Sequence, residues 1–221
     1  MPPKPDFDVG RDFTPVLALA KQPLFIAARS SLEANDLRSL ATLAKTEPGK
    51  LSYGSPGTGT EAHLVMARFA RNAGIALMHI PYRGGGPAVT DLMGGRIDLV
   101  ALSEIALRPA IDSGKAKLLA TLDPARVAGF PNVPSVVESG YSGDVYVPRV
   151  ALFGPSKLPS EVVARWVSLS AALKGDVAFL KGMKDTGSEL SILGPTELSP
   201  LLITDRRDWQ ELIEQLGIQA E

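Results

Sequence analysis

Short apolar runs alternate with segments of helical spacing over the first 122 residues. Apolar residues recur every three or four positions between the runs, which predicts helices. The runs predict strands at 16–20, 24–28, 51–53, 75–80, 97–102 and 117–121, and the intervening helices fall at 37–44, 60–73, 87–93 and 108–113. Such alternation with short loops predicts an α/β fold, with a largely parallel sheet and helices on both faces.

The pattern changes after Leu122. Residues 123–143 hold three prolines and three glycines with little periodicity, which predicts a linker or a wrapping loop. A strand is predicted at 145–153, and the remainder is predicted to be helical, at 161–173, 177–183 and 196–216. We therefore expect a compact α/β unit, followed by a mainly helical tail with almost no sheet of its own.

Composition narrows the function classes. The chain has 221 residues and a formal net charge of -1, and no basic run is interleaved with aromatic residues, so we expect no nucleic-acid partner. Its lack of cysteine rules out disulfides, thiolate metal sites and a cysteine nucleophile, but it leaves the compartment open. No apolar stretch reaches the roughly 20 residues that cross a bilayer. The first six residues, MPPKPD, lack the apolar segment of a signal peptide.

Two glycine-rich loops are the strongest chemical signal. Residues 51–60 (LSYGSPGTGT) and 79–86 (HIPYRGGG) each follow a predicted strand and precede a predicted helix. Bare N–H groups at such helix starts bind anions. The candidate ligand-binding residues are Ser55, Gly57, Thr58, Gly59, Thr60 and His63 on the first loop and helix start, and Tyr82, Arg83, Gly84 and Gly85 on the second. Backbone N–H groups would hold a carboxylate, and Arg83 or Thr58 would tune selectivity.

Other interpretations of the first loop stay open. Gly54 and Gly59 have the spacing of a Walker A loop, but Thr60-Glu61 stands where Lys-Ser/Thr is required. Gly57-x-Gly59-x-x-Ala62 fits a permissive dinucleotide fingerprint without its acidic ribose ligand, and Arg83 could instead meet the 2′-phosphate of NADP. The plain structural alternative is a tight turn that needs glycine for its backbone angles.

No catalytic constellation is predicted. Ser55 does not lie in a nucleophile elbow, because that motif would need a glycine at Tyr53. His63 and His79 lack metal-ligand spacing. A structural hydrogen bond is the commoner role for a histidine placed like His63, and His79 is predicted to be packed or edge-exposed. Asp91, Arg96 and Asp98 are interpreted as surface or helix-end charges. We expect no catalysis, no metal and no cofactor.

The order of motifs resembles one known family, the solute-binding proteins of tripartite tricarboxylate transporters, also called the Bordetella uptake gene family. The matching segments are DFTPV at 12–16, AKTEPGKLSYGS at 44–55, GTGTEAH at 57–63, IPYRG at 80–84, TDLMGGRID at 90–98, AKLLA at 116–120, PNVPSVVESG at 131–140 and GP at 154–155. The resemblance implies a two-lobed α/β fold of the type II periplasmic-binding-protein kind, whose lobes close on a small carboxylate without chemistry. In this chain it implies one complete lobe with a parallel or mixed sheet, plus the mainly helical C-terminal part of a second lobe. It also implies a periplasmic location and, as partners, a mono-, di- or tricarboxylate and the membrane components of the transporter.

The chain departs from the family pattern in two places. Its first residues match a point after the family's signal peptide and first βα unit, which predicts a cytoplasmic location if Met1 is the true start. The expected organisation is a remnant of the first lobe and hinge at 1–23, a complete α/β second lobe at 24–122, and a linker, crossover strand and helical part of the first lobe at 123–221. Residues 147–150 (VPRV) replace a tryptophan-bearing segment. We expect weak binding of C4–C6 di- or tricarboxylates, and a non-binding remnant is the alternative.

Overall fold

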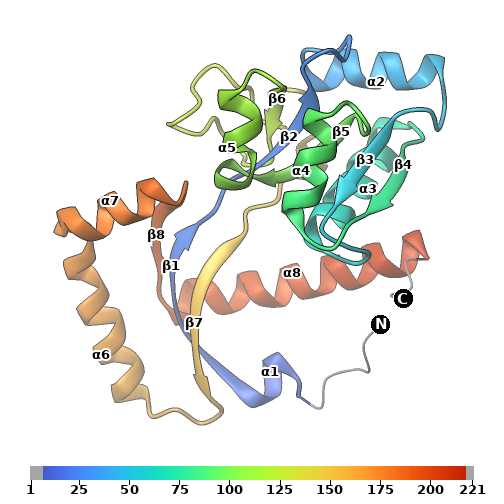
Figure 1. Cartoon of the computed structure of the whole chain (residues 1–221). Helices are drawn as coiled ribbons and strands as arrows, with labels where there is room; N and C mark the ends of the chain where they lie inside the picture. The colour runs from blue at the N-terminus through green and yellow to red at the C-terminus, as the bar shows by residue number, and fades with distance from the viewer. Residues whose placement is uncertain (1–6, 218–221) are drawn as a thin grey trace. The chain divides into compact units, whose positions relative to one another are not determined.

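The computed structural model describes residues 7–217, so the start at residues 1–6 lies outside the described part (Figure 1). The chain divides into two compact units. Within the described residues, unit 1 comprises 7–22 and 148–214, and unit 2 comprises 23–147 with 215–217. Residues 123–147, which the sequence groups with the C-terminal region, are thus placed in unit 2. Each unit is described separately below.

Unit 2 contains a five-stranded mixed sheet. Its strands are β2 (Leu24–Arg29), β3 (Ser52–Ser55), β4 (Met78–Pro81), β5 (Leu99–Ser103) and β6 (Ala116–Thr121), in the order β4-β3-β5-β2-β6. β3 runs parallel to β4 and β5, whereas β2 is antiparallel to β5 and β6. The α/β class is confirmed, with β2 as the exception to a largely parallel sheet. Apolar periodicity reports burial and not strand direction, so the pattern alone does not show which strand is antiparallel.

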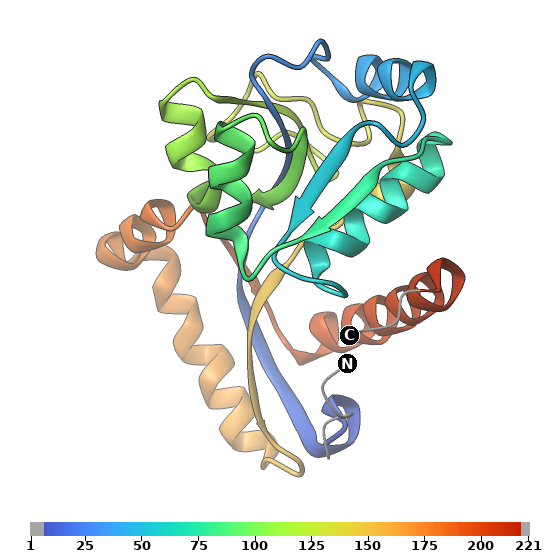
Figure 2. The ribbon, with the colours of Figure 1, turned by 45° about the vertical axis from the view of Figure 1, so that its right-hand side comes forward.

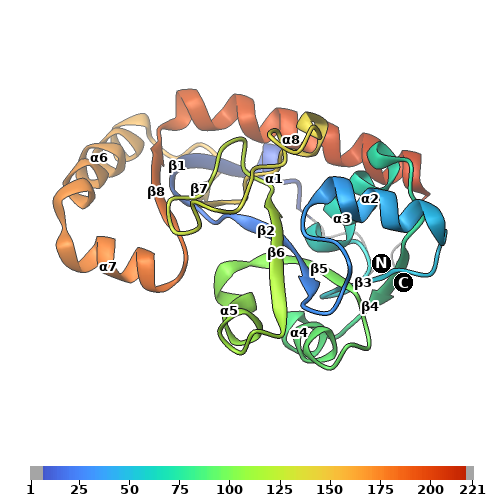
Figure 3. The same ribbon diagram turned by 90° about the horizontal axis from the view of Figure 1, so that it is seen from above.

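Helices cover both faces of this sheet, as predicted. Figure 3 shows α4 (Gly85–Met93) and α5 (Glu104–Asp112) on one side, and α2 (Leu37–Thr46) and α3 (Glu61–Ala73) on the other. The placement of α3 and α4 on opposite faces follows from right-handed crossovers, since the chain moves one way across the sheet from β3 to β4 and the other way from β4 to β5. The core under α4 and α5 includes the buried side chains of Phe25, Leu92, Val100 and Leu107.

The helix ends in unit 2 have local causes. Asp36 and Ser39 form a reciprocal capping box at the start of α2. Gly74 ends α3 in the left-handed conformation with φ 62°. α5 begins at Glu104, four residues before the predicted start at residue 108, and it carries Pro109 in its interior.

The segment after β6 wraps over unit 2. Val136 donates its N–H to the Thr121 carbonyl at 2.8 Å, and the Phe130 ring packs edge-on against Phe25 with centroids 5.1 Å apart. A short 3-10 turn at Ser142–Asp144 buries the Asp144 carboxylate. The wrapping loop predicted at 123–143 therefore carries its own buried contacts.

Unit 1 has a three-stranded antiparallel sheet. β1 (Phe13–Lys21) lies between β7 (Arg149–Pro155) and β8 (Glu189–Leu193). The prediction that everything after the strand at 145–153 is helical is wrong at β8, and the tail does have a sheet. β8 is only five residues long and half-buried throughout, so its alternation of polar and apolar residues is too short to identify it.

Helices surround the unit 1 sheet (Figure 2). They are α1 (Val9–Asp12), α6 (Ser160–Ser170), α7 (Val177–Asp185) and α8 (Pro195–Leu216), with a 3-10 turn at Ala171–Gly175. A bidentate ion pair joins Arg206 of α8 to Asp8 at the start of α1, with contacts of 3.0 and 2.7 Å. A groove of about 590 Å³ runs beside this pair and is lined mainly by apolar side chains, among them Phe13, Phe153 and Ile203.

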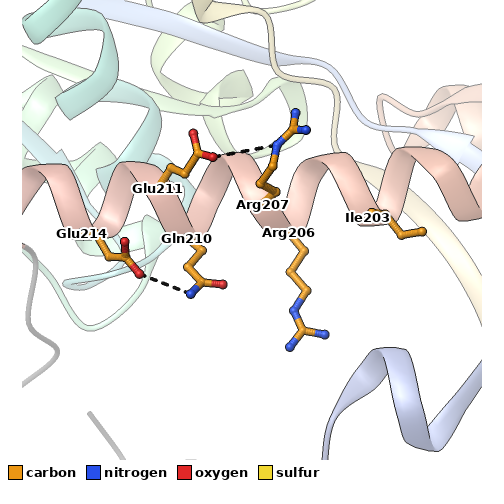
Figure 4. Close-up of a pocket in the computed structure, with 6 residues that line it drawn as sticks. All are labelled: Ile203, Arg206, Arg207, Gln210, Glu211 and Glu214. Carbon is orange, nitrogen blue, oxygen red and sulfur yellow. Dashed lines mark hydrogen bonds and ion pairs between the residues drawn. The ribbon is translucent and has the colours of Figure 1, made fainter.

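The exposed face of α8 is mainly polar, with Ile203 as an exposed apolar residue (Figure 4). Arg207 lies 4.0 Å from Glu211, and Gln210 donates to Glu214 at 3.2 Å. Both pairs are spaced four residues apart, so each contributes only a few tenths of a kcal/mol to the helix, roughly 0.3–0.5. Across the described helices, none is both long enough and apolar enough to traverse a bilayer.

Candidate functional site

Three helices of unit 2 begin at one edge of the mixed sheet. Because β4 and β5 run parallel to β3, their carboxyl ends share an edge, and α3, α4 and α5 follow from it. The residues that precede these helices are Thr60, Gly84 and Ser103, and none of them caps its helix with a side-chain hydrogen bond. The partial positive charges of the helix starts therefore remain open to an anion.

Internal hydrogen bonds hold the first loop. The Ser55 hydroxyl oxygen accepts the Gly57 N–H at 3.2 Å, and the Thr60 hydroxyl donates to the Gly57 carbonyl at 2.7 Å. Gly57 and Gly59 have φ of 149° and 78°, in the range that favours glycine. Both positions therefore need glycine for their backbone angles, as the turn interpretation of this loop predicts. These contacts use up the Gly57 N–H and the Thr60 hydroxyl as donors.

His63 closes the same loop from the first turn of α3. Its Nδ1 accepts the Gly59 N–H at 3.0 Å. An amide can only donate, so Nδ1 carries no proton and the neutral ring is protonated at Nε2. Burial lowers the pKa of His63. The Gly59 N–H is thus directed at a ring nitrogen of its own chain, and His63 has the structural hydrogen bond that is common for such a histidine.

His79 stacks on His63 behind the loop. The two rings are parallel within 5°, with centroids 3.8 Å apart, and the Tyr53 ring lies 4.9 Å from His79. His79 Nε2 is 2.7 Å from the Ser55 hydroxyl oxygen. Burial, aided by the charge that His63 would carry, lowers the pKa of His79 to about 4. The sequence interpretation of His79 as packed or edge-exposed misses this contact, because it depends on the register of β4 against β3.

The second loop is tied to the first and to α4. The Tyr82 N–H donates to the Ser55 carbonyl at 2.9 Å, and the Gly84 N–H donates to the Pro56 carbonyl at 3.2 Å. The Tyr82 hydroxyl donates to Asp91 at 2.9 Å, and Arg96 pairs with the same carboxylate at 2.8 Å. Asp91 is therefore more than a surface charge, since it orients Tyr82.

Asp98 departs from its sequence interpretation in the same way. Its carboxylate accepts the Ser52 N–H at 2.8 Å, the Ser52 hydroxyl at 3.0 Å and the Arg29 guanidinium at 2.8 Å. These contacts fix the start of β3, and so they position the loop that follows it. The Asp98 carboxylate, which was predicted to be a surface or helix-end charge, therefore has a structural role.

The candidate residues therefore fall into two groups. Members of the first group are used within unit 2: Gly57, Gly59 and Gly84 donate through their N–H groups, Ser55, Thr60 and Tyr82 donate through their hydroxyls, and His63 accepts the Gly59 N–H. The other group has no hydrogen-bond or ion-pair partner among the residues that the structure describes. It consists of the N–H and hydroxyl of Thr58, the guanidinium of Arg83, which is exposed, and the N–H of Gly85.

Ser103 is a further candidate residue at this edge, and sequence reasoning missed it. It ends β5 and directly precedes α5, at the same edge as the two glycine loops. A serine that separates an apolar run from a helix is an N-terminal signal, but it is hidden here by the helix start predicted at residue 108. Within the described part of the chain, no group of three or more His, Asp or Glu side chains has the geometry of a metal site.

Comparison with known proteins identifies the family. The sequence model of the tripartite tricarboxylate transporter family receptor matches residues 1–218. The chain belongs to this receptor family. The resemblance seen in the motifs is thereby confirmed, and so is the periplasmic-binding-protein-like α/β fold.

Individual relatives match nearly the whole chain in sequence or in structure. A UPF0065 protein from the tcbD-tcbE intergenic region of Pseudomonas sp. (strain P51) is 31% identical over 222 residues, which are 99% of this chain and 65% of the relative. The periplasmic binding protein BugD is 30% identical with a TM-score of 0.76, over 95% of this chain and 71% of BugD. Rpa4515 of R. palustris, solved with adipate, is 24% identical with a TM-score of 0.84, over 99% of this chain and 73% of Rpa4515. The chain thus spans about 65% of the length of that curated relative.

Proposed function

We propose that this receptor-family chain captures a small mono-, di- or tricarboxylate outside the cytoplasm for a tripartite tricarboxylate-type transporter, without catalysis. The supporting observation is the set of donors at the sheet edge of unit 2. The Thr58 N–H and hydroxyl, the Gly85 N–H and the Arg83 guanidinium have no protein partner in the described chain, next to two helix starts that lack side-chain caps.

The remaining loop contacts preorganise these donors. Ser55, His63 and the Gly57 carbonyl hold the first loop, and the Pro56 carbonyl anchors the second loop through Gly84. A carboxylate would accept the backbone N–H groups without reorganising the loops, and Arg83 would add a charged fork. This division of labour refines the sequence expectation, because it assigns positioning to Ser55, Gly57, Gly59, Thr60, His63, Tyr82 and Gly84 and ligand contact to Thr58, Arg83 and Gly85.

The ligand class follows from the donor set. Neutral N–H and hydroxyl donors at a helix start recognise the carboxylate group itself and leave the remainder of the acid to other side chains. Rpa4515, which shares the fold, was solved with adipate, a carboxylate of this class. Within this class we propose C4–C6 di- and tricarboxylates as ligands, and we propose the membrane components of the transporter as partners. The NADP alternative has no support in the comparisons.

Calorimetric titration with succinate, adipate and citrate at pH 7.5 tests the proposal. Arg83→Gln removes the charged fork and is expected to weaken binding of the best of these acids at least about tenfold, as for a hydrogen bond to a charged group. Lys45→Gln is the matched control, because it removes an exposed positive charge on α2, away from the loops. Absence of heat with all three acids would contradict the proposal and favour a non-binding remnant. Equal losses in both variants would contradict the assignment of Arg83.

A further inference from the structure

The hydrogen bond between Gly59 and His63 requires one charge state of the ring. Nδ1 must present a lone pair to the Gly59 N–H, at 3.0 Å. Protonation of the imidazole would convert Nδ1 into a second donor and place two N–H groups against each other. Gly59 sits at φ 78° in a loop already closed by the Thr60 hydroxyl on the Gly57 carbonyl, so its N–H cannot turn away without reshaping the loop.

The contacts of His79 leave its ring free to be neutral or charged, so the unfavourable state is the one in which both rings carry a charge. The Ser55 hydroxyl has a single proton, and its oxygen lies 2.9 Å from the Gly57 carbonyl and 2.7 Å from His79 Nε2. Both contacts are satisfied when Ser55 donates to the carbonyl and Nε2–H donates to Ser55. His79 therefore keeps this bond in either charge state, whereas a charge on both stacked rings would repel at a centroid distance of 3.8 Å.

The surrounding elements offer no compensating anion. On β3 the titratable neighbour is Tyr53, and β5 contributes only apolar residues and Ser103. On α3, Glu61 accepts the Tyr146 hydroxyl at 3.2 Å, and Arg68 donates to the Asp144 and Val145 carbonyls.

Beyond β4, the Asp91 carboxylate is occupied by Tyr82 and Arg96. Among the described residues, no carboxylate hydrogen-bonds either imidazole. An imidazolium at His63 would thus be buried, next to a second ring that can charge, and without a counter-ion.

We propose that His63 is a positioning residue of the first glycine loop, which keeps its binding shape only while the His63 ring is uncharged, so that ligand capture is lost on acidification. The predicted loss of ligand capture rests on the proposed carboxylate-binding function, whereas the coupling of the loop shape to the charge of the ring does not. The direction agrees with the lowered pKa of both histidines, whose cause is burial.

Amide NMR of the whole chain between pH 7.5 and 4.5 tests the coupling without any ligand. In the wild type, the chemical shift of the Gly59 amide is expected to change in a titration step as the pH falls. Asn places an acceptor oxygen close to the position of Nδ1 but does not titrate, so His63→Asn is expected to abolish the step. His79→Gln keeps a donor to Ser55 and leaves His63 in place, so the step is expected to remain. These two variants cover both histidines of the chain.

The Gly74 amide, which donates to the Arg71 carbonyl at the other end of α3, reports general acid effects. A Gly59 amide that moves no more than that of Gly74, or a step that persists in His63→Asn, would overturn the proposal.

Adipate titration at pH 7.5 and 5.0 tests the predicted loss of ligand capture. Between these two pH values, the affinity of the wild type for adipate is expected to fall at least about fivefold more than the affinity of His63→Asn. The variant serves as the reference because protonation of adipate itself affects both proteins equally. Equal falls of affinity in the two proteins would overturn the predicted loss of capture. If adipate fails to bind at pH 7.5 while the Gly59 step is present, the positioning role stands and the proposed function is contradicted for this acid.

Discussion

The Asp98 carboxylate, just before β5, accepts both the backbone N–H and the hydroxyl of Ser52 at the start of β3, at 2.8 and 3.0 Å. The same carboxylate binds the Arg29 guanidinium at the end of β2. One side chain thus connects three strands at the edge of the sheet opposite to the glycine loops. This tie fixes where β3 begins, and therefore where its loop emerges.

Asp98→Asn tests the strength of this tie. An amide oxygen can still accept from Ser52, but the charge opposite Arg29 is lost and the new NH₂ group faces other donors. We expect the free energy of unfolding to fall by about 1.5–3 kcal/mol, the range for hydrogen bonds to a charged group. Urea unfolding at pH 7 measures it. Glu47→Gln, which breaks an exposed pair with Lys50, should cost no more than about 0.5 kcal/mol. Similar losses in the two variants would contradict a special role for Asp98.

Gly54 marks a close approach within the core of unit 2. A Cβ atom at this position would lie 2.6 Å from Ile97 Cδ1 and 3.2 Å from the Cβ of Ala88. Gly54→Ala is therefore expected to reduce the free energy of unfolding by about 1–3 kcal/mol through overpacking. Gly86→Ala is the control, because its Cβ would meet no atom within 4 Å.

A double variant identifies the cause of the Gly54→Ala effect. Ile97→Val removes Cδ1, so the combined variant should be less destabilised than the sum of the two single changes. Strict additivity would show that the clash with Ile97 is not responsible. Chemical denaturation of the four proteins gives the coupling free energy.

Much of this fold was predictable from the sequence because its helices are regular and amphipathic. The helix predicted at 60–73 is α3, which begins at Glu61 and ends at Gly74 as the glycine signal indicates. β8 was missed, because a half-buried strand of five residues leaves too short a pattern. The early start of α5 was missed because Pro109 favours a helix start nearby, whereas the structure holds it in the helix interior.

The candidate site was predictable in outline but not in its division of roles. Glycine spacing identified both loops, since glycine is needed where the backbone turns with positive φ, as at Gly59 and Gly84. The stack of His63 on His79 depends on the pairing of Tyr53 with His79 across β3 and β4, which local sequence does not encode. Tertiary register therefore decides which donors are used internally and which remain for a ligand.

The buried Asp144 carboxylate predicts an unusual pH dependence. Burial raises its pKa, although Arg68 and Asn72 oppose the shift. The folded chain then holds this proton more tightly than the unfolded chain. The contribution of Asp144 to stability is thus present at low pH and is lost as the pH rises from its ordinary value of 3.8 through the raised pKa.

Urea unfolding of wild type and Asp144→Asn across pH 2.5–7.5 checks this sign. Relative to the variant, the wild type should lose stability as the pH rises. Asp36→Asn is the control of opposite sign, because the Ser39 N–H lowers the pKa of Asp36. Relative to Asp36→Asn, the wild type should gain stability as the pH rises towards and above the ordinary value of 3.8. Difference curves of the same sign would contradict the assignment for Asp144.

His79 predicts a loss of stability in acid. Its pKa is lowered from 6.5 to about 4 in the folded chain by burial and by His63. Between these values the unfolded chain binds the proton and the folded chain does not, so the free energy of unfolding decreases as the pH falls from 6.5 towards 4. His79→Gln keeps a donor to the Ser55 hydroxyl and removes the titration. The wild-type curve should therefore fall more steeply than the variant curve in urea unfolding between pH 7 and 4.5. Parallel curves over this range would show that His79 titrates alike in the folded and unfolded chains, and that its contact with His63 leaves its proton affinity unchanged.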